Sequence, residues 1–227
     1  MIYDEFKNRI SIYMELFEKG LKKQANEEMR MLVNYINTLP ENDIDTIMYR
    51  FLSEYCDLNI WNFLKKRGNA DIPFELKKCI RLWLQPKCDD NKMPELRWYY
   101  EMYHNDPVGH QIAVEYLEKA YLSDKCDQKT VDMLFDSYLD VLGWGAHHFP
   151  EGCIIASSVK EDCIQNCENI LNENNVSEHL ANEFQYYRKL YECYDCYVKD
   201  GRTGDFDTYL AESDIDYYYN KAFYYSK

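Results

Sequence analysis

The sequence predicts an all-α fold built from stacked antiparallel helical hairpins, either as a helical-repeat-like array or as an irregular bundle. Apolar residues recur at three- and four-residue spacing along most of the chain, and no stretch of strand length alternates apolar with polar residues. The chain has 227 residues and is 46% hydrophobic, which is ordinary for a folded protein. The predicted helices are short, so each must bury its apolar stripe against its neighbours.

Three apolar stripes begin the chain. The first two lie on either side of Gly20, over residues 6–17 and 21–36, and predict a helical hairpin that Pro40 ends. The third runs over residues 44–55. Further helices are expected over 60–66, 73–84, 94–103, 107–122, 128–142, 158–171, 177–198, 207–211 and from 215 onward.

The stripes also predict the core and the domain organisation. The side chains expected to be largely buried are Phe6, Ile10, Phe17, Leu32, Phe51, Leu117, Leu134 and Tyr138. We expect one domain over residues 1–227. A soft sub-boundary near 86–93 is expected to separate a charge-balanced half, 1–85, from an acidic, Tyr-rich half, 94–227, because residues 85–92 combine proline with consecutive polar residues, as loops do.

The acidity of the chain is concentrated in its second part. Residues 1–100 hold 16 acidic and 16 basic side chains, whereas residues 101–227 hold 24 acidic and 10 basic ones, which gives the formal charge of −14. The same part carries 15 of the 22 tyrosines. Tyrosines among carboxylates suit recognition of a basic protein or peptide, and so strongly negative a surface disfavours nucleic acid.

Two groups of side chains are candidates for binding such a partner. The aromatic group belongs to the predicted last helix and comprises Tyr217, Tyr218, Phe223, Tyr224 and Tyr225. The acidic group is a line along one helix face and comprises Asp132, Asp136 and Asp140. A homodimer contact would explain the exposed rings as well, and a solvated helix face or a hard-cation site would explain the carboxylates.

The sequence also predicts a cytoplasmic protein that is not associated with a membrane. Its N-terminus lacks the basic and apolar regions of a signal peptide, and no uncharged stretch approaches the length of a membrane span. The nine cysteines lack the spacing of a secreted disulfide framework, so most are expected to be reduced and buried.

The segment 143–153 is the one long irregular stretch with chemically capable side chains. Its candidate functional residues are Trp144, His147, His148 and Glu151. Loops held by rigid helices often carry function, and imidazoles serve as bases or ligands. The alternative is a structural bridge, in which Gly143 ends a helix while Trp144 and Phe149 fill the gap between helical pairs.

A zinc site is the metal hypothesis that the spacing favours. Its ligands would come from Cys153, Cys193, Cys196, His147 and His148. Ordinary buried cysteines are the alternative, and no cofactor is otherwise expected. A di-iron bundle needs two Glu-x-x-His motifs, whereas the chain has one, at Glu101 and His104.

One segment resembles a known repeat family. The small-large-small spacing of Ala113, Leu117 and Ala120 resembles the second helix of a tetratricopeptide repeat, and Val131, Leu134 and Tyr138 resemble the first helix of the next repeat. The resemblance covers residues 107–142 and departs from the family pattern at Lys125 and Phe135. It implies a scaffold whose concave face holds a peptide or protein, and no catalysis.

Two functional classes remain. The chain has no glycine-rich phosphate loop, no Gly-x-Ser-x-Gly and no His-Glu-x-x-His motif. The sequence therefore favours a non-catalytic interaction module whose acidic half binds a basic protein or peptide, as an immunity or inhibitor protein does. The alternative is a metal-dependent enzyme or sensor centred on 143–153, and a third reading is that the acidity only maintains solubility.

Overall fold

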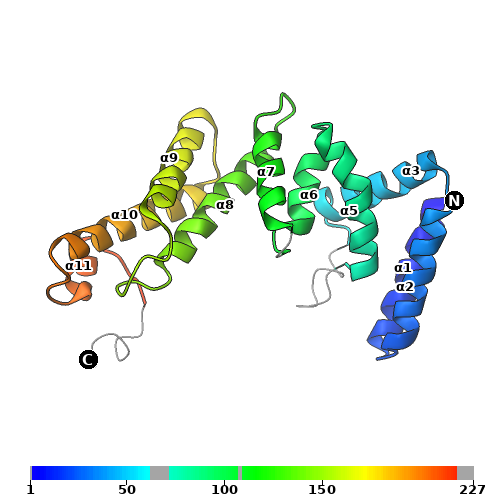
Figure 1. Ribbon diagram of the computed structural model, residues 1–227, viewed down its shortest axis with the longest axis horizontal. Coiled ribbons are helices and arrows are strands. Elements are labelled where there is room, and N and C mark those ends of the chain that lie inside the picture. Colours follow the sequence, from blue (N-terminus) through cyan, green and yellow to red (C-terminus); the bar gives the residue numbers. More distant parts are fainter. Residues whose placement is uncertain (1, 62–71, 107–108, 219–227) are drawn as a thin grey trace. The chain divides into compact units, whose positions relative to one another are not determined.

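The computed structural model describes residues 2–61, 72–106 and 109–218, and these residues form ten α-helices and one π-helix without any strand (Figure 1). The all-α prediction is therefore confirmed. In chain order the helices are α1 Ile2–Glu18, α2 Lys22–Asn37, α3 Glu41–Leu52, η1 Ser53–Asp57, α5 Phe74–Asp89, α6 Glu95–Tyr103, α7 His110–Tyr121, α8 Gln128–Ala146, α9 Ser157–Glu173, α10 Glu178–Lys199 and α11 Phe206–Glu212. The chain divides into two compact units, 1–120 and 121–227.

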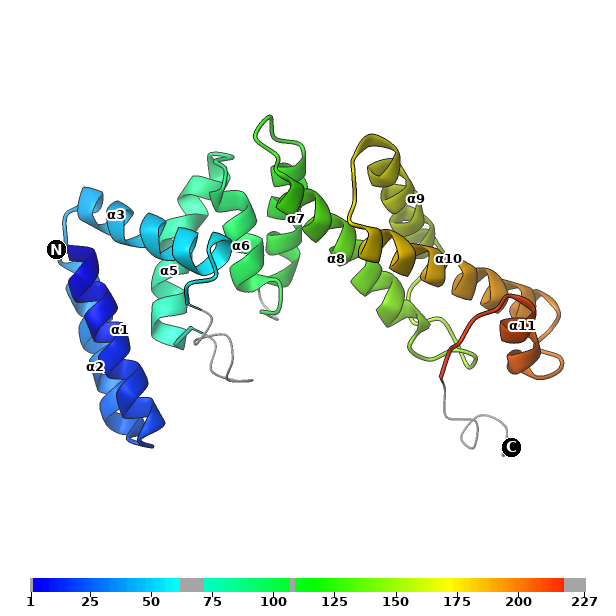
Figure 2. The same cartoon turned by 180° about the vertical axis from the view of Figure 1, so that it is seen from behind.

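The first unit begins with the predicted hairpin. The helices α1 and α2 lie side by side and are joined through Gly20, whose φ of 75° suits a residue without a Cβ (Figure 2). The helix α3 packs on α1, and α5 packs on both α2 and α6. Their apolar stripes meet, so Phe6, Leu32 and Phe51 are fully buried.

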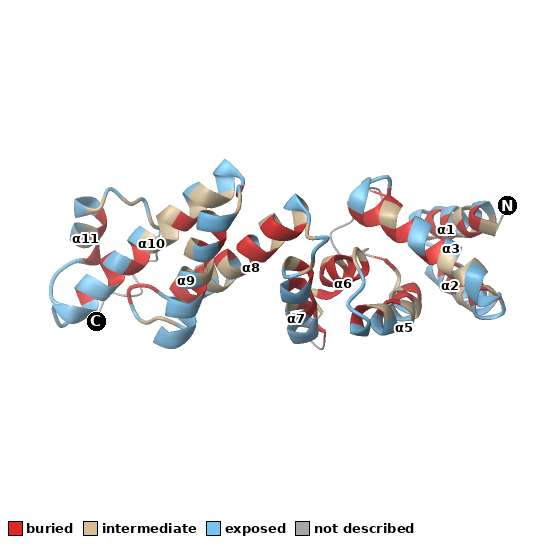
Figure 3. Ribbon diagram, turned by 90° about the horizontal axis from the view of Figure 1, so that it is seen from above, coloured by how far each residue is buried: buried red, intermediate tan, exposed pale blue. Residues whose placement is uncertain are grey.

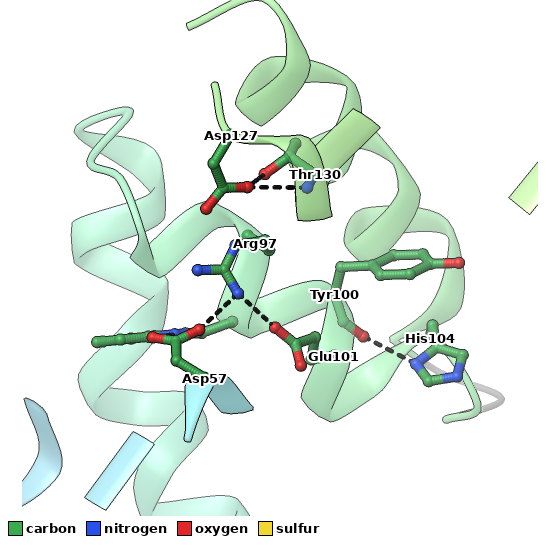
Figure 4. Close-up of polar contacts among 8 residues, drawn as sticks. Asp57, Arg97, Tyr100, Glu101, His104, Asp127 and Thr130 are labelled. Atoms are coloured by element: carbon green, nitrogen blue, oxygen red, sulfur yellow. Dashed lines mark hydrogen bonds and ion pairs between the residues drawn. The ribbon is translucent and has the colours of Figure 1, made fainter. Parts of the chain in front are cut away.

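The second unit is formed by α8, α9, α10 and α11. The helix α8 packs against both α9 and α10, and α11 packs on α10 (Figures 1 and 2). The start of α8 is capped by Asp127, whose carboxylate accepts a hydrogen bond of 2.8 Å from the backbone nitrogen of Thr130 (Figure 4). The cap satisfies a backbone donor that the helix itself leaves unpaired.

Six of the eight side chains that are predicted to be largely buried belong to the buried core. The six buried side chains are Phe6, Ile10, Leu32, Phe51, Leu117 and Leu134. Phe17 and Tyr138 are of intermediate exposure and so are less completely buried than the other six. Figure 3 shows buried residues (red) on the helices of both units. Phe17 lies in the last turn of α1, where fewer neighbours cover it. In α8 the buried stripe passes through Phe135 and Leu139, which leaves Tyr138 at its edge.

The predicted loop at 85–92 is helical over much of its length. The helix α5 continues through Pro86 to Asp89, so the expected sub-boundary near 86–93 falls within the first unit. Pro86 stands in the last turn, at an exposed position, where its missing N–H removes one backbone hydrogen bond. The division between the two compact units follows Ala120 instead.

The predicted last helix does not form over Ile215–Tyr218, the part of it that the structure describes. The chain leaves α11 through Asp214, whose φ of 54° is left-handed, and the amide of Ile215 donates to the carbonyl oxygen of Leu210 at 3.0 Å. This hydrogen bond closes a turn of six residues, satisfies a carbonyl group at the end of α11 and directs the chain away from the helix axis. The rest of that predicted helix and most of the one at 60–66 lie outside the described residues.

Candidate functional site

The end of α8 packs closely against α10 because it contains two glycines. A Cβ atom at Gly143 would lie 2.7 Å from the hydroxyl oxygen of Tyr187, and one at Gly145 would collide with Tyr191 and with Ile155. The hydroxyl group of Tyr191 donates to the carbonyl oxygen of Leu142 at 2.8 Å. The expectation that Gly143 ends the helix is therefore wrong, because these glycines make room for tyrosine rings while α8 continues to Ala146.

The segment that follows α8 is anchored by one buried aromatic side chain. The Phe149 ring is fully buried and stacks on Tyr194 with 3.8 Å between ring centroids, while the centroid of the Tyr191 ring lies 5.2 Å away with its plane nearly perpendicular. The hydroxyl group of Tyr217 donates to the carbonyl oxygen of Ala146 at 2.8 Å. This part of the 143–153 segment is therefore a structural bridge between α8, α10 and the chain beyond α11.

Three side chains at the same place point outward. Trp144 is 62% exposed, so the expectation that it fills a gap in the core is wrong. Its ring stacks on that of His147, with centroids 5.9 Å apart and planes 12° from parallel, and the ring of His148 meets His147 edge-on at 5.3 Å. Both imidazoles are exposed. The carbonyl oxygen of the fourth candidate, Glu151, accepts a hydrogen bond from Arg202 at 2.8 Å.

These side chains continue a line of carboxylates along α8. Positions 136, 140 and 144 are four residues apart and position 147 is three residues further on, so they share one helix face. Tyr187 borders this face over Gly143, and its pKa is raised by burial and by the charges of Glu183 and Asp140. We call this surface the acidic–aromatic face and define it as Asp136, Asp140, Trp144, His147 and Tyr187.

The first carboxylate of the line has a structural role. The side chain of Asp132 accepts hydrogen bonds from the amide of Gln128 at 3.0 Å and from the backbone nitrogen of Ser177 at 3.4 Å. Ser177 directly precedes α10, so Asp132 ties the α9–α10 turn to α8. Asp136 and Asp140 are exposed, and Asp140 forms no ion pair with any described residue.

The tyrosines of the predicted C-terminal anchor are used in two different ways. Tyr217 is half-buried and faces Phe149, whereas Tyr218 is 91% exposed. The hydroxyl group of Tyr186 donates to the carbonyl oxygen of Asp216 at 3.3 Å, which holds this segment against α10. Phe223, Tyr224 and Tyr225 lie outside the described residues.

The structure does not assemble the predicted zinc ligands. Among the described residues, which include all five predicted ligands, no three histidine, cysteine or acidic side chains converge into a group that could hold a metal ion. The Cys193 thiol donates to the carbonyl oxygen of Tyr209 at 3.5 Å, and burial raises its pKa. Cys153 lies beside the Tyr191 hydroxyl group, and Cys196 is exposed. Helix packing thus gives these thiols separate surroundings.

The first unit contains a buried carboxylate that the sequence pattern does not indicate. Glu54 belongs to the π-helix η1 and is 7% exposed. It accepts hydrogen bonds from Tyr3 at 2.8 Å and from Arg50 and Trp61 at 3.1 Å each, and Lys7 lies 3.7 Å away. Burial alone would raise the pKa of Glu54, but these donors and the lysine charge outweigh it and lower the pKa.

A second buried charge lies between η1 and α6. Arg97 is 4% exposed and donates to the carboxylates of Asp57 and Glu101, at 2.7 Å each (Figure 4). The indole of Trp98 also donates to Asp57, at 3.1 Å. In the sequence, Arg97 and Glu101 have the spacing of an ordinary surface pair on a helix, so only the packing reveals their burial. Both buried groups have structural partners and offer no open reaction site.

Comparisons with other proteins add no family to this geometry. No family model, curated protein or solved structure matches the chain. None of the helices in the described part of the chain is long and apolar enough to cross a membrane. Function must therefore be argued from the residues themselves, and the acidic–aromatic face is the candidate because it carries the exposed Trp144 ring beside the exposed carboxylate of Asp140.

Proposed function

We propose that this chain is a non-catalytic protein-interaction module whose acidic, Tyr-rich C-terminal half binds a basic protein or peptide. The observation that carries the proposal is Trp144, a large ring that is 62% exposed on a helix face lined with carboxylates. Tryptophan is prominent among the residues that dominate binding interfaces, and here its ring lies among exposed carboxylates rather than alone. Its position beside Asp140 suits a cationic group.

The chemistry of the face supports an arginine or lysine side chain as the element that is recognised. Among the described residues no cation lies over the Trp144 ring, and Asp140 is one helical turn away. A cation stacked on that ring would gain about 1–2 kcal/mol, and pairing with an exposed carboxylate would add up to about 1 kcal/mol. Several such contacts are needed for a stable complex.

The charge of the whole unit supports the same conclusion. Residues 121–227 contain 20 acidic and nine basic side chains, a net charge of −11. Such a field accelerates association with a cationic partner and makes the association rate depend on salt. An inhibitor that covers a cationic site of its target is one form of this function. The resemblance to tetratricopeptide-repeat hairpins and the predicted cytoplasmic location are compatible with it.

The test is binding to an array of basic and acidic peptides by the wild type and by charge-matched variants. We expect basic peptides to bind, and Trp144→Ala to weaken the binding by about tenfold. The pair Asp136→Asn and Asp140→Asn should slow association, whereas the control pair Glu161→Gln and Asp162→Asn on α9 removes the same charge from another helix and should have a smaller effect.

Three outcomes would contradict the proposal. Binding that the two charge pairs weaken equally would show that only net charge matters. If Trp144→Ala leaves the binding unchanged, the Trp144 ring takes no part in recognition. If basic peptides bind no better than acidic ones, the proposed function is wrong.

A further inference from the structure

The helix α5 in the first unit presents an apolar ridge to solvent. Phe74, Lys78 and Leu82 are four residues apart and therefore share one face. Phe74 is 77% exposed, Leu82 is 69% exposed, and Lys78 is also exposed. Single exposed apolar side chains are common on soluble proteins, so exposure alone carries no conclusion. Here, however, the ridge is bordered by a hollow on each side, and both hollows are lined by Lys78 and Leu82.

The first hollow is an apolar groove between α2, α3 and α5. It has a volume of about 480 Å³, within the usual range for binding pockets. Most of its lining is apolar, with Val33 and Ile36 from α2, Ile44 and Met48 from α3, and Leu82 from α5, and its charged side chains are one of each sign, Glu75 and Lys78. A groove of this composition favours aliphatic or aromatic side chains over polar ones.

The second hollow lies on the other side of the ridge and is cationic. It has a volume of about 330 Å³, and its lining holds three basic side chains, Lys77, Lys78 and Arg81, and one acidic side chain, Asp106. The guanidinium group of Arg81 pairs with Asp106 and lies over the ring of Tyr103, 4.4 Å from the ring centroid. Overall, α5 carries four basic and two acidic side chains, in a chain that holds 40 acidic and 26 basic ones. The ridge is therefore a locally basic surface on an acidic protein.

We propose that the α5 ridge docks an acidic, amphipathic helix of a partner protein. A helical ridge with a groove on each side is the shape into which a second helix packs, with side chains three and four residues apart entering the grooves. The apolar groove would take its apolar face, and Lys78 with its neighbours would select carboxylates along the edge. Anionic nucleic acid is disfavoured, because residues 1–120 as a whole hold 20 acidic and 17 basic side chains.

This inference is independent of the proposed function. It concerns residues of the first unit and a partner of the opposite charge. If basic peptides fail to bind, the proposal for the α5 ridge is unaffected. If the helical peptides described next fail to bind, the proposed function is unaffected.

The experiment is a selection of helical peptides on the full-length protein. The displayed peptides carry fixed apolar positions at helical spacing and random polar positions. We expect the selected sequences to be enriched in aspartate and glutamate, and their binding to fall at least about tenfold in Lys78→Glu and in Leu82→Ala. Both substituted positions are exposed, so the variants should fold. The control Leu122→Ala removes an equally exposed leucine, 81% accessible, from the second unit and should change nothing.

Other results would overturn the inference. It fails if no selected peptide depends on Lys78 and Leu82, or if the dependent peptides are basic or uncharged. It also fails if sedimentation shows that the protein is a dimer and that Leu82→Ala dissociates it, because the ridge would then be a contact between two copies of this chain.

Discussion

Replacing Gly145 by alanine should destabilise the second unit, although alanine is the better helix former. In the middle of a helix, alanine is favoured over glycine by about 1 kcal/mol, and this is an upper limit for Gly145, which lies in the last turn of α8. At this position, however, the added methyl group would collide with the Tyr191 hydroxyl group and with the side chain of Ile155. Forcing extra volume into a packed site costs about 1–3 kcal/mol.

Displacement of Tyr191 adds a second loss. Its hydrogen bond to the carbonyl oxygen of Leu142, which spans α8 and α10, contributes about 1 kcal/mol. This loss roughly cancels the gain in helix propensity, so we expect the free energy of unfolding to fall by about 1–3 kcal/mol. Urea unfolding followed by circular dichroism measures the change, and hydrogen exchange of the α10 amides locates it.

Gly152→Ala is the matched control, because a Cβ atom there would meet no atom within 4 Å and its φ is not left-handed. The control should unfold within a few tenths of a kcal/mol of the wild type. If Gly145→Ala is as stable as the wild type, or more stable, then close approach of Tyr191 is not the reason for this glycine. The presentation of Trp144 by a tightly held helix end would then need another explanation.

Three further predictions test the remaining conclusions. Phe149→Ala should lower the free energy of unfolding by about 3–5 kcal/mol, whereas Trp144→Ala should change it by less than about 0.5 kcal/mol, as measured by urea unfolding, because only the first ring is buried. The carboxylate of Glu54 has a lowered pKa, so its contribution to stability is complete above about pH 4.5 and is lost as the pH falls through its folded-state pKa. Glu54→Gln should therefore make the unfolding midpoint depend less on pH in the acid range. An unchanged pH dependence would contradict the buried network around Glu54. Burial raises the pKa of Cys167 to about 12, so iodoacetamide should label the exposed Cys196 first under native conditions, and mass spectrometry that found the reverse order would contradict the described packing.

The sequence by itself was enough to predict most of the helices and much of the core. Helical periodicity locates α1, α2 and α6 closely and identifies Phe6 and Phe51 as buried, because a stripe of apolar side chains can be hidden only by packing against a neighbour. The charge imbalance and the tyrosine content of residues 101–227 are likewise properties of the sequence alone. From these the acidic, Tyr-rich character of that part of the chain could be anticipated in outline.

Only the tertiary structure decided what the individual side chains of that surface do. Gly143 was expected to end a helix, and Trp144 to fill a gap; instead a tyrosine from a distant helix packs over the glycine, and the indole is left in solvent. A glycine in the sequence can either end a helix or leave room for a neighbouring ring, and only the side chain that packs against it distinguishes these two roles. For the same reason the burial of Glu54 and Arg97 could not be predicted, because the cost of a buried charge is offset by residues that are far away in the sequence.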